Sequence, residues 1–348
     1  MGTTPRARSP LPQVGAFFGE EPRNSGHLTV LQPTVTLSLS RFEARGTRCS
    51  RLETGVSPKR IFESVGPSSL EFDRRSFRCR HTLLGHPALE LENLAGVVQR
   101  LPEDNVFFSS GLLPKDADFD RAHVDYRTGL SLKDTVENMM TSNSYIMLRA
   151  PEQDPSFHDL FRLLLAEVEG LMRAQGVGTT AVDPMLYLFI ASPGSVTPFH
   201  LDRYSTLLMQ FRGTKEVHIS PAWDEQVVPA ADLESFVARS GSKVNYRETF
   251  DTTAIRYAFG PGDALHIPFV APHYVKNGND DVSVSLSIIF NTRETARHLR
   301  ALRTNHLLRS RLGPLGYRPT PVNRFLPLDH VKSNVERVVR RASRFLPA

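Results

Sequence analysis

The sequence predicts a mainly β domain with flanking helices. Strands are predicted around His200, from His266 to Pro268 and from Val282 to Ile288, where extended or alternating residues stand between Gly, Asp and Pro turn signals. Helical apolar spacing is found before and after this strand-rich region. With 40% hydrophobic residues, the chain can bury a substantial core.

The elements ahead of residue 187 alternate between helix and strand. Proline, glycine and cap residues mark their ends, because Pro cannot continue a helix, whereas Asp followed by Pro is favourable at a helix N-terminus. The predicted helices are Ala88 to Leu101, Ser131 to Met140 and Asp154 to Gln175, and the predicted strands are Val106 to Phe108 and Tyr145 to Leu148.

Charge divides the chain into three regions. Residues 1–66 carry 9 Lys/Arg against 5 Asp/Glu, residues 67–292 carry 20 against 29, and residues 293–348 carry 13 against 3. The overall net charge of +5 therefore conceals an acidic central domain between basic ends. We expect residues 67–292 to form the main domain, with helices at its N-terminal side, and residues 293–348 to form a basic helical extension.

Residues 1–66 are rich in Ser, Thr, Pro, Gly and Arg, which predicts a poorly ordered leader; a transit peptide or a mis-chosen start would look similar. Cys49 and Cys79 have no paired spacing, which favours a reducing compartment. The chain has no transmembrane run and no apolar signal core at its start. We expect a cytoplasmic protein that does not bind membranes.

A metal site is predicted from His200, Asp202 and His273. In an extended strand, residues two apart project to the same face, so His200 and Asp202 converge on one point. His273 follows Ala271-Pro272 at the start of another predicted strand, and His266 is the alternative third ligand. Two histidines and one carboxylate form the facial triad of non-haem iron enzymes, which leaves positions open for substrate and oxygen.

Two polar residues accompany this triad. Thr197 stands three residues before His200, and Lys215 stands fifteen residues after it, on the next predicted strand. A hydroxyl and an ammonium group there suit a dicarboxylate that chelates iron at one end and meets a cation at the other.

The spacing T-x-x-H-x-D, followed by Gln210, Gly213 and Lys215 and then by P-H-x-V-x-N, resembles the JmjC (jumonji, cupin-like) family over roughly residues 142–292. Members are Fe(II)- and 2-oxoglutarate-dependent oxygenases on a double-stranded β-helix, and the pattern is similar to that of the asparaginyl hydroxylase of hypoxia-inducible factor. The resemblance implies that His200, Asp202 and His273 hold Fe(II). It also implies that Thr197, Lys215 and Tyr145 bind the distal carboxylate of 2-oxoglutarate. Thr206 and Ser287 depart from the family pattern, because asparagines are found near these positions in relatives.

The function implied is a dioxygenase that uses O2 and 2-oxoglutarate to hydroxylate a protein, peptide or small molecule. One alternative is a cupin-fold binding or regulatory protein, related to transcription. Another is a metal-dependent isomerase or hydrolase on the same barrel, which would not need Thr197 and Lys215 together.

The last region is predicted to hold two basic amphipathic helices. Leu299, Leu302 and Leu307 belong to the apolar stripe of the first, and Val331 to Leu346 contain that of the second. In several JmjC relatives C-terminal helices form the dimer, so a homodimer or packing on the acidic domain is favoured over nucleic-acid binding. The segment from Ala222 to Tyr257 interrupts the strand pattern and is either a roof over the site or a surface insertion.

Overall fold

The computed structural model describes residues 60–63, 72–240 and 244–343. All of these residues belong to one compact unit, Arg60–Ala348. Most of the predicted leader, with Cys49, lies outside the described residues, and Phe62–Glu63 within it form strand β1. Cys79 is buried and free.

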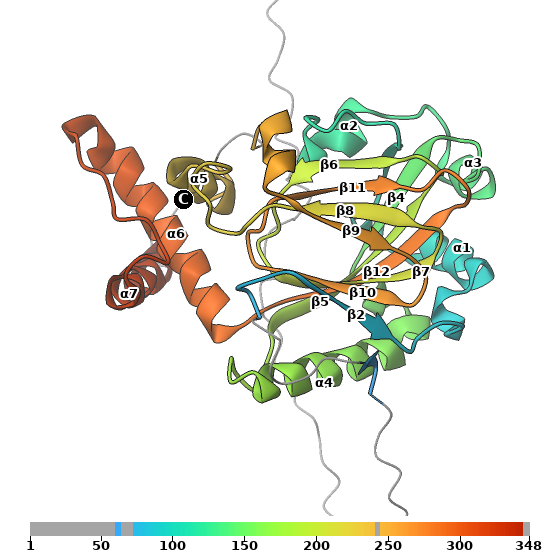
Figure 1. Ribbon diagram of the computed structural model, residues 1–348, viewed down its shortest axis with the longest axis horizontal. Coiled ribbons are helices and arrows are strands. Elements are labelled where there is room, and N and C mark those ends of the chain that lie inside the picture. The colour runs from blue at the N-terminus through green and yellow to red at the C-terminus, as the bar shows by residue number, and fades with distance from the viewer. Residues whose placement is uncertain (1–59, 64–71, 241–243, 344–348) are drawn as a thin grey trace, which may run out of the picture. The chain divides into compact units, whose positions relative to one another are not determined.

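The described strands build two antiparallel sheets (Figure 1). The eight-stranded sheet has the order β1-β2-β10-β7-β12-β5-β4-β3, and the four-stranded sheet has the order β6-β11-β8-β9. The larger sheet comprises β1 (Phe62–Glu63), β2 (Phe77–His81), β3 (Val106–Ser110), β4 (Ser144–Arg149), β5 (Val182–Ala191), β7 (Ser205–Arg212), β10 (Asp263–Ile267) and β12 (Ser283–Asn291). The smaller sheet comprises β6 (Val196–His200), β8 (Lys215–Ile219), β9 (Ile255–Phe259) and β11 (His273–Asn277).

From β5 onward the chain passes back and forth between the two sheets. Strands β5, β7, β10 and β12 join the larger sheet, and β6, β8, β9 and β11 join the smaller one. This is the topology of a double-stranded β-helix, so the predicted fold is confirmed. Gly213 makes the turn from β7 to β8 at φ +66°, and a side chain there would clash with the Val282 carbonyl oxygen, 2.6 Å from the Cβ position.

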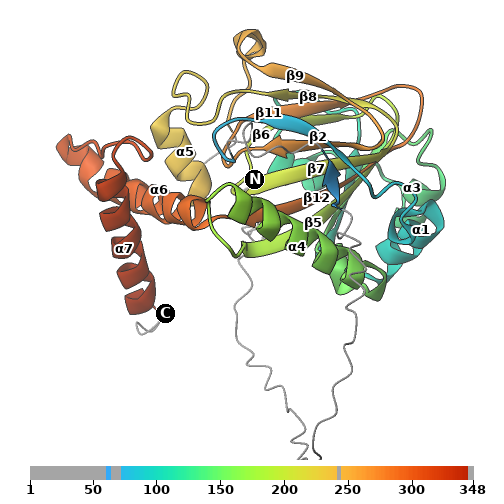
Figure 2. The same cartoon turned by 60° about the horizontal axis from the view of Figure 1, so that its bottom comes forward.

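Helices α1 (Leu91–Arg100) and α4 (His158–Ala174) cover one face of the larger sheet (Figure 2). Leu160, Leu164 and Val168 of α4 are buried there, and they pack with side chains from alternate positions of β4, β5, β7 and β12 in one core. Asp154 caps the entry to α4 by accepting from the Ser156 amide. The opposite face of the larger sheet therefore lines the interior of the barrel.

The helix predicted from Ser131 to Met140 is shorter than expected. Ser131 caps α3 (Leu132–Glu137), but the Asn138 side chain donates to the Asp134 carbonyl at 2.9 Å and so competes with the helical backbone. The short helix α2 (Ala122–Asp125) precedes it. Within the segment from Ala222 to Tyr257, α5 (Ala230–Val237) packs in a second core with helix α6.

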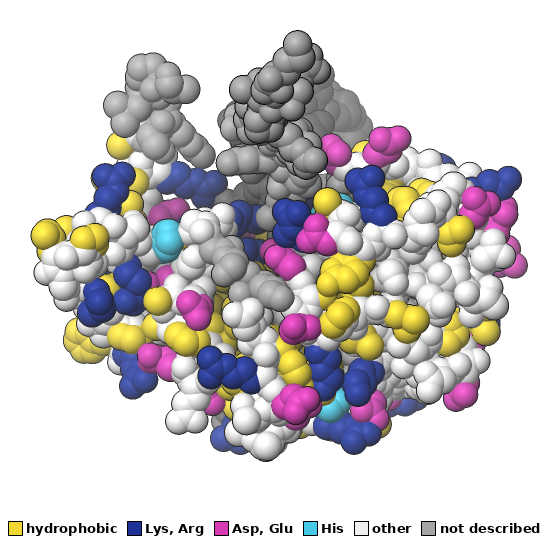
Figure 3. Space-filling model, turned by 90° about the horizontal axis from the view of Figure 1, so that it is seen from above, with side chains coloured by type: hydrophobic (Ala, Val, Ile, Leu, Met, Phe, Trp, Pro, Cys, Tyr) yellow, Lys and Arg dark blue, Asp and Glu magenta, His cyan; other side chains and the backbone are white. Residues whose placement is uncertain are grey.

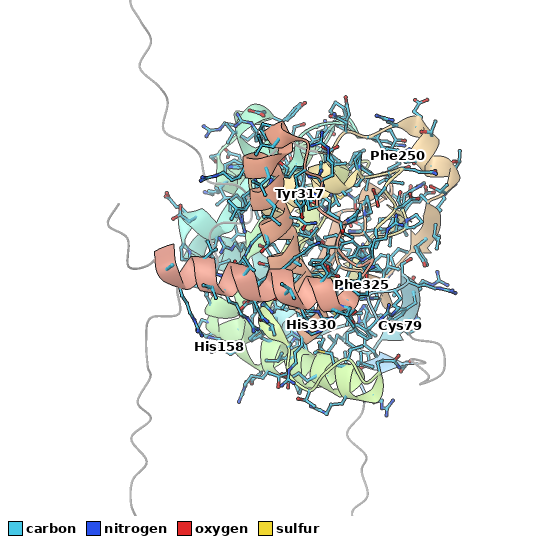
Figure 4. All side chains as sticks on the ribbon, turned by 90° about the vertical axis from the view of Figure 1, so that its left-hand side faces the viewer. Cys79, His158, Phe250, Tyr317, Phe325 and His330 are labelled. Carbon is cyan, nitrogen blue, oxygen red and sulfur yellow. The ribbon has the colours of Figure 1, made fainter. Side chains whose placement is uncertain are left out.

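Helices α6 (Arg293–Leu312) and α7 (Leu326–Ser343) form the C-terminal region. In α6, Leu299 and Leu302 are buried as predicted, whereas Leu307 and Leu312 are 37% and 38% exposed because the far half of the helix extends beyond the barrel (Figure 1). In Figure 4, α7 crosses α6, and the labelled Tyr317 and Phe325 belong to the linker between the two helices. Among the described residues, neither these two helices nor any other combines the length and the apolar character needed to span a membrane.

Helix α7 packs on α6 with its polar side. Asp329, Lys332 and Ser333 are buried, and the Thr304 hydroxyl donates to the Lys332 carbonyl at 2.8 Å. The predicted apolar stripe faces the opposite way: Val331, Val335, Val338 and Val339 are between 42% and 67% exposed. In Figure 3, hydrophobic and Lys/Arg side chains lie together at this end of the molecule.

Candidate metal centre and dicarboxylate pocket

The structure brings His200, Asp202 and His273 together. His200 is the last residue of β6, His273 is the first residue of β11, and the antiparallel register pairs them directly. One potential ligand atom from each of the three residues lies within 4.8 Å of the other two. Asp202 is not in the strand as predicted, since β6 ends at His200, yet its carboxylate oxygen is 3.9 Å from His273 Nε2.

Hydrogen bonds fix the orientation of both imidazoles. Nδ1 of His200 bonds to the Pro198 carbonyl at 2.7 Å, and Nδ1 of His273 bonds to the Ala271 carbonyl at 3.0 Å. A carbonyl can only accept, so each Nδ1 carries the proton and each Nε2 keeps its lone pair for a metal. Burial, with the neighbouring His273, lowers the pKa of His200 to about 4, so this ring stays neutral at physiological pH.

The Asp202 carboxylate is held by Thr206, whose hydroxyl donates to Oδ2 at 3.2 Å. Thr206 therefore supplies a contact to the acidic ligand despite its departure from the family pattern. His266, the alternative third ligand, is fully buried elsewhere: its Nδ1 bonds to the Thr206 carbonyl and its Nε2 accepts from the Asp73 amide. The donor set of two neutral imidazoles and one carboxylate fits a divalent first-row transition metal.

A second polar group lies inside the barrel at Lys215, the first residue of β8. Lys215 is only 7% exposed, and its ammonium donates to the hydroxyl of Ser285 on β12. Ser285 in turn donates to Gln210 Oε1 at 2.8 Å. Sequence reasoning missed Ser285, because its only signal was an inward position on an alternating strand.

The environment of Lys215 is short of negative charge. Among the ion pairs between described residues, none involves Lys215, and burial lowers its pKa to about 7. Burying a cation without a carboxylate is costly, so such a group is typical of a site that receives an anionic ligand.

Tyr145 and Thr197 lie together on the inner side of the same barrel. Each is 7% exposed, and the Tyr145 hydroxyl bonds to Thr197, while burial raises the pKa of the phenol. Strand β11 runs between β6 and β8, pairing Val275 with Thr197 and Asn277 with Lys215. Lys215 is thus on the second strand after His200, not on the next one as predicted.

An aromatic wall stands beside the metal ligands. Phe119 lies in the 3-10 turn η3 (Phe119–Arg121). Its ring centroid is 4.5 Å from that of His200 and 6.4 Å from that of Tyr145. Tyr145 also contacts Phe189 on β5. The sequence carried no signal for Phe119, because η3 belongs to an irregular loop.

The barrel and the inward His-Asp-His cluster define a cupin that can bind a metal. The model of the family described as "Cupin-like domain" matches residues 114–296, more than half of the chain. The chain belongs to this family of cupin-like proteins.

No curated protein matches the chain. Among solved structures, YcfD from Escherichia coli is 16% identical with a TM-score of 0.45, and the match covers 78% of this chain and 65% of YcfD. YcfD, described as a ribosomal oxygenase, was also solved with cobalt and 2-oxoglutarate, at 16% identity, a TM-score of 0.40 and coverage of 78% and 64%. AerE from Microcystis aeruginosa is 9% identical, with a TM-score of 0.21 and coverage of 31% and 36%. The chain spans slightly less than two thirds of YcfD.

Proposed function

We propose that the protein is an Fe(II)- and 2-oxoglutarate-dependent dioxygenase that hydroxylates a protein, peptide or small-molecule substrate. The observation that carries the proposal is the presence, in one barrel, of the His200-Asp202-His273 cluster and of the buried Lys215 without a carboxylate partner. A metal cupin of another class needs the first group but has no use for the second.

Two groups of residues would bind the metal and the cosubstrate, one at each end of the pocket. His200, Asp202 and His273 would hold Fe(II), which when bound supplies the activation of O2 coupled to oxidative decarboxylation of 2-oxoglutarate. Lys215 would bind the distal carboxylate of 2-oxoglutarate through a charge-assisted hydrogen bond, assisted by the hydroxyls of Thr197 and Tyr145.

The surrounding side chains orient these groups. Ser285 and Gln210 hold the Lys215 ammonium in place, and the Pro198 and Ala271 carbonyls keep both histidines in the tautomer that binds metal. Lys215 itself is buried, and a low-dielectric environment strengthens the ion pair expected there.

The test is an anaerobic titration of the purified chain with Fe(II), with and without 2-oxoglutarate, followed by visible absorption. Chelation of bound Fe(II) by the keto acid produces a metal-to-ligand charge-transfer band, which should be present in the parent and absent in Asp202→Ala. The exposed Lys276→Ala variant is a matched control and should keep the band. Fe(II) binding without 2-oxoglutarate binding would instead favour another metal-dependent cupin enzyme, and binding of neither would favour a binding or regulatory protein.

We further propose that α7 joins two copies in a homodimer. The outward valine stripe leaves apolar surface in water, and the surplus of Lys and Arg in residues 293–348 matches the surplus of Asp and Glu in residues 67–292. These features favour a second copy over nucleic acid as the partner. A cytoplasmic location remains our proposal, supported by the free thiol of Cys79.

A further inference from the structure

We propose that Asp73 is a positioning residue for the metal ligand Asp202. Asp73 lies in the turn before β2, outside the matched family region, and adopts the left-handed conformation at φ 61°. Its side chain is 15% exposed and faces the start of β7 and the loop after β10. The inference rests on the proposed metal binding and names a residue that this binding requires.

The first link runs through β7. Asp73 Oδ1 accepts a hydrogen bond from the Ser205 hydroxyl at 2.5 Å, and Ser205 is fully buried. The next residue is Thr206, whose hydroxyl donates to the Asp202 carboxylate. Asp73 therefore fixes the backbone that carries the immediate partner of the ligand.

The second link runs through the loop between β10 and β11. The same Asp73 oxygen accepts from the Phe269 amide at 3.0 Å. The next residue, Val270, is held at φ 55°, a conformation that is unfavourable for a β-branched residue, and its amide donates to the Asp202 carbonyl at 3.1 Å. A strained backbone of this kind persists only where neighbouring contacts fix it, and the bond to Phe269 is one of them.

The third link uses the backbone of Asp73. Its amide donates to His266 Nε2 at 3.1 Å, and Nδ1 of the same ring donates to the Thr206 carbonyl at 3.2 Å. Phe72 packs over His266 with ring centroids 4.6 Å apart. All three links end on Thr206 or Val270, the two residues that hold Asp202.

Loss of the Asp73 carboxylate should therefore displace a metal ligand without removing it. Partners of metal ligands typically contribute 10- to 100-fold to metal affinity, and a residue one contact further away should fall near the lower end. We expect Asp73→Ala to weaken Fe(II) binding about tenfold and to alter the visible spectrum of the Co(II)-substituted protein. Asp73→Asn keeps an oxygen that can accept from Ser205 and Phe269, so it should stay within about threefold of the parent.

Asp154→Ala is the matched control, because Asp154 is also a largely buried aspartate that accepts hydrogen bonds, from Arg100 and Ser156 at the start of α4. It should lower the melting temperature and leave the Fe(II) dissociation constant and the Co(II) spectrum unchanged. If Asp73→Ala does not fold, Ser205→Ala breaks the first link alone and should weaken Fe(II) binding several-fold.

The inference is overturned if the folded Asp73 variant, or Ser205→Ala in its place, binds Fe(II) within twofold of the parent with an unchanged Co(II) spectrum. An equal effect of Asp154→Ala would also overturn it, because general destabilisation would then explain the result. A parent protein that binds no metal would refute the proposed function, which is a separate outcome.

Discussion

Replacement of Lys215 by methionine should stabilise the ligand-free protein and weaken its binding of 2-oxoglutarate. Burial holds the pKa of Lys215 at about 7, against an ordinary value of 10.5. The unfolded chain therefore takes up a proton between pH 10.5 and 7 that the folded chain does not, so stability falls as the pH drops through this window. At pH 7 the cost of burying Lys215 is on the order of 3 to 5 kcal/mol.

Methionine removes this cost at a similar side-chain length but gives up the hydrogen bond to Ser285, worth about 1 kcal/mol. The net gain of about 2 to 4 kcal/mol should raise the melting temperature by roughly 5 to 15 °C. Binding should change in the opposite direction, because truncating one partner of a buried charge pair costs about 2 kcal/mol or more, which is roughly 30-fold in the dissociation constant.

Two assays measure these effects on the same samples. Thermal unfolding at pH 7 without ligand reports stability, and calorimetry on the anaerobic Fe(II) form reports 2-oxoglutarate affinity. Lys276→Met, on the exposed side of β11, should change neither quantity. A Lys215→Met protein that is less stable than the parent, or that binds 2-oxoglutarate as tightly, would refute the reasoning.

Four further outcomes are expected. His273→Ala should abolish Fe(II) binding at micromolar metal, and retention of full affinity in a metal titration would remove it from the ligand set. Thr197→Val should weaken 2-oxoglutarate by roughly 2- to 10-fold, because it loses one hydrogen bond of about 0.5 to 1.5 kcal/mol, while Fe(II) affinity stays constant. Since the pKa of Lys215 is about 7 in the empty pocket, 2-oxoglutarate binding at pH 8 should take up nearly one proton, which calorimetry in buffers of different ionisation enthalpy detects; no uptake would contradict the proposed ion pair. Val338→Asp should halve the mass in sedimentation, whereas Leu163→Asp, at another exposed apolar position on α4, should not; an unchanged mass argues against the α7 interface.

The metal cluster could be predicted because its chemistry dictates residue types and spacing within short stretches. The tripeptide alone was insufficient, since His123-Val124-Asp125 repeats it in the short helix α2, with Asp125 paired to Arg121. Pairing of His273 with His200 across β6 and β11 distinguishes the genuine cluster, and the Pro-His frame pointed to it.

Other features depend on contacts that no local pattern records. The end of β6 at His200 could not be predicted from local sequence. Asp202 bonds to Val270, which is distant along the chain, and to Thr206 on the next strand, β7, instead of continuing the pairing of β6 with β11. The outward turn of the α7 valines escaped prediction for a related reason. An apolar stripe indicates that a helix face will be covered, but it does not tell whether the same chain or another one covers it.

The sheet order has a consequence for synthesis of the protein on the ribosome. Strand β2 pairs with β10, and Asp73 bonds to Phe269, 196 positions later in the chain. The edge of β2 that faces away from β1 must therefore stay unpaired until β10 has been translated, and closing so long a loop is slow. Metal uptake through all three ligands should begin only after His273 has left the exit tunnel, when strands β1 to β10 have already been made, so the ion cannot nucleate the early part of the barrel.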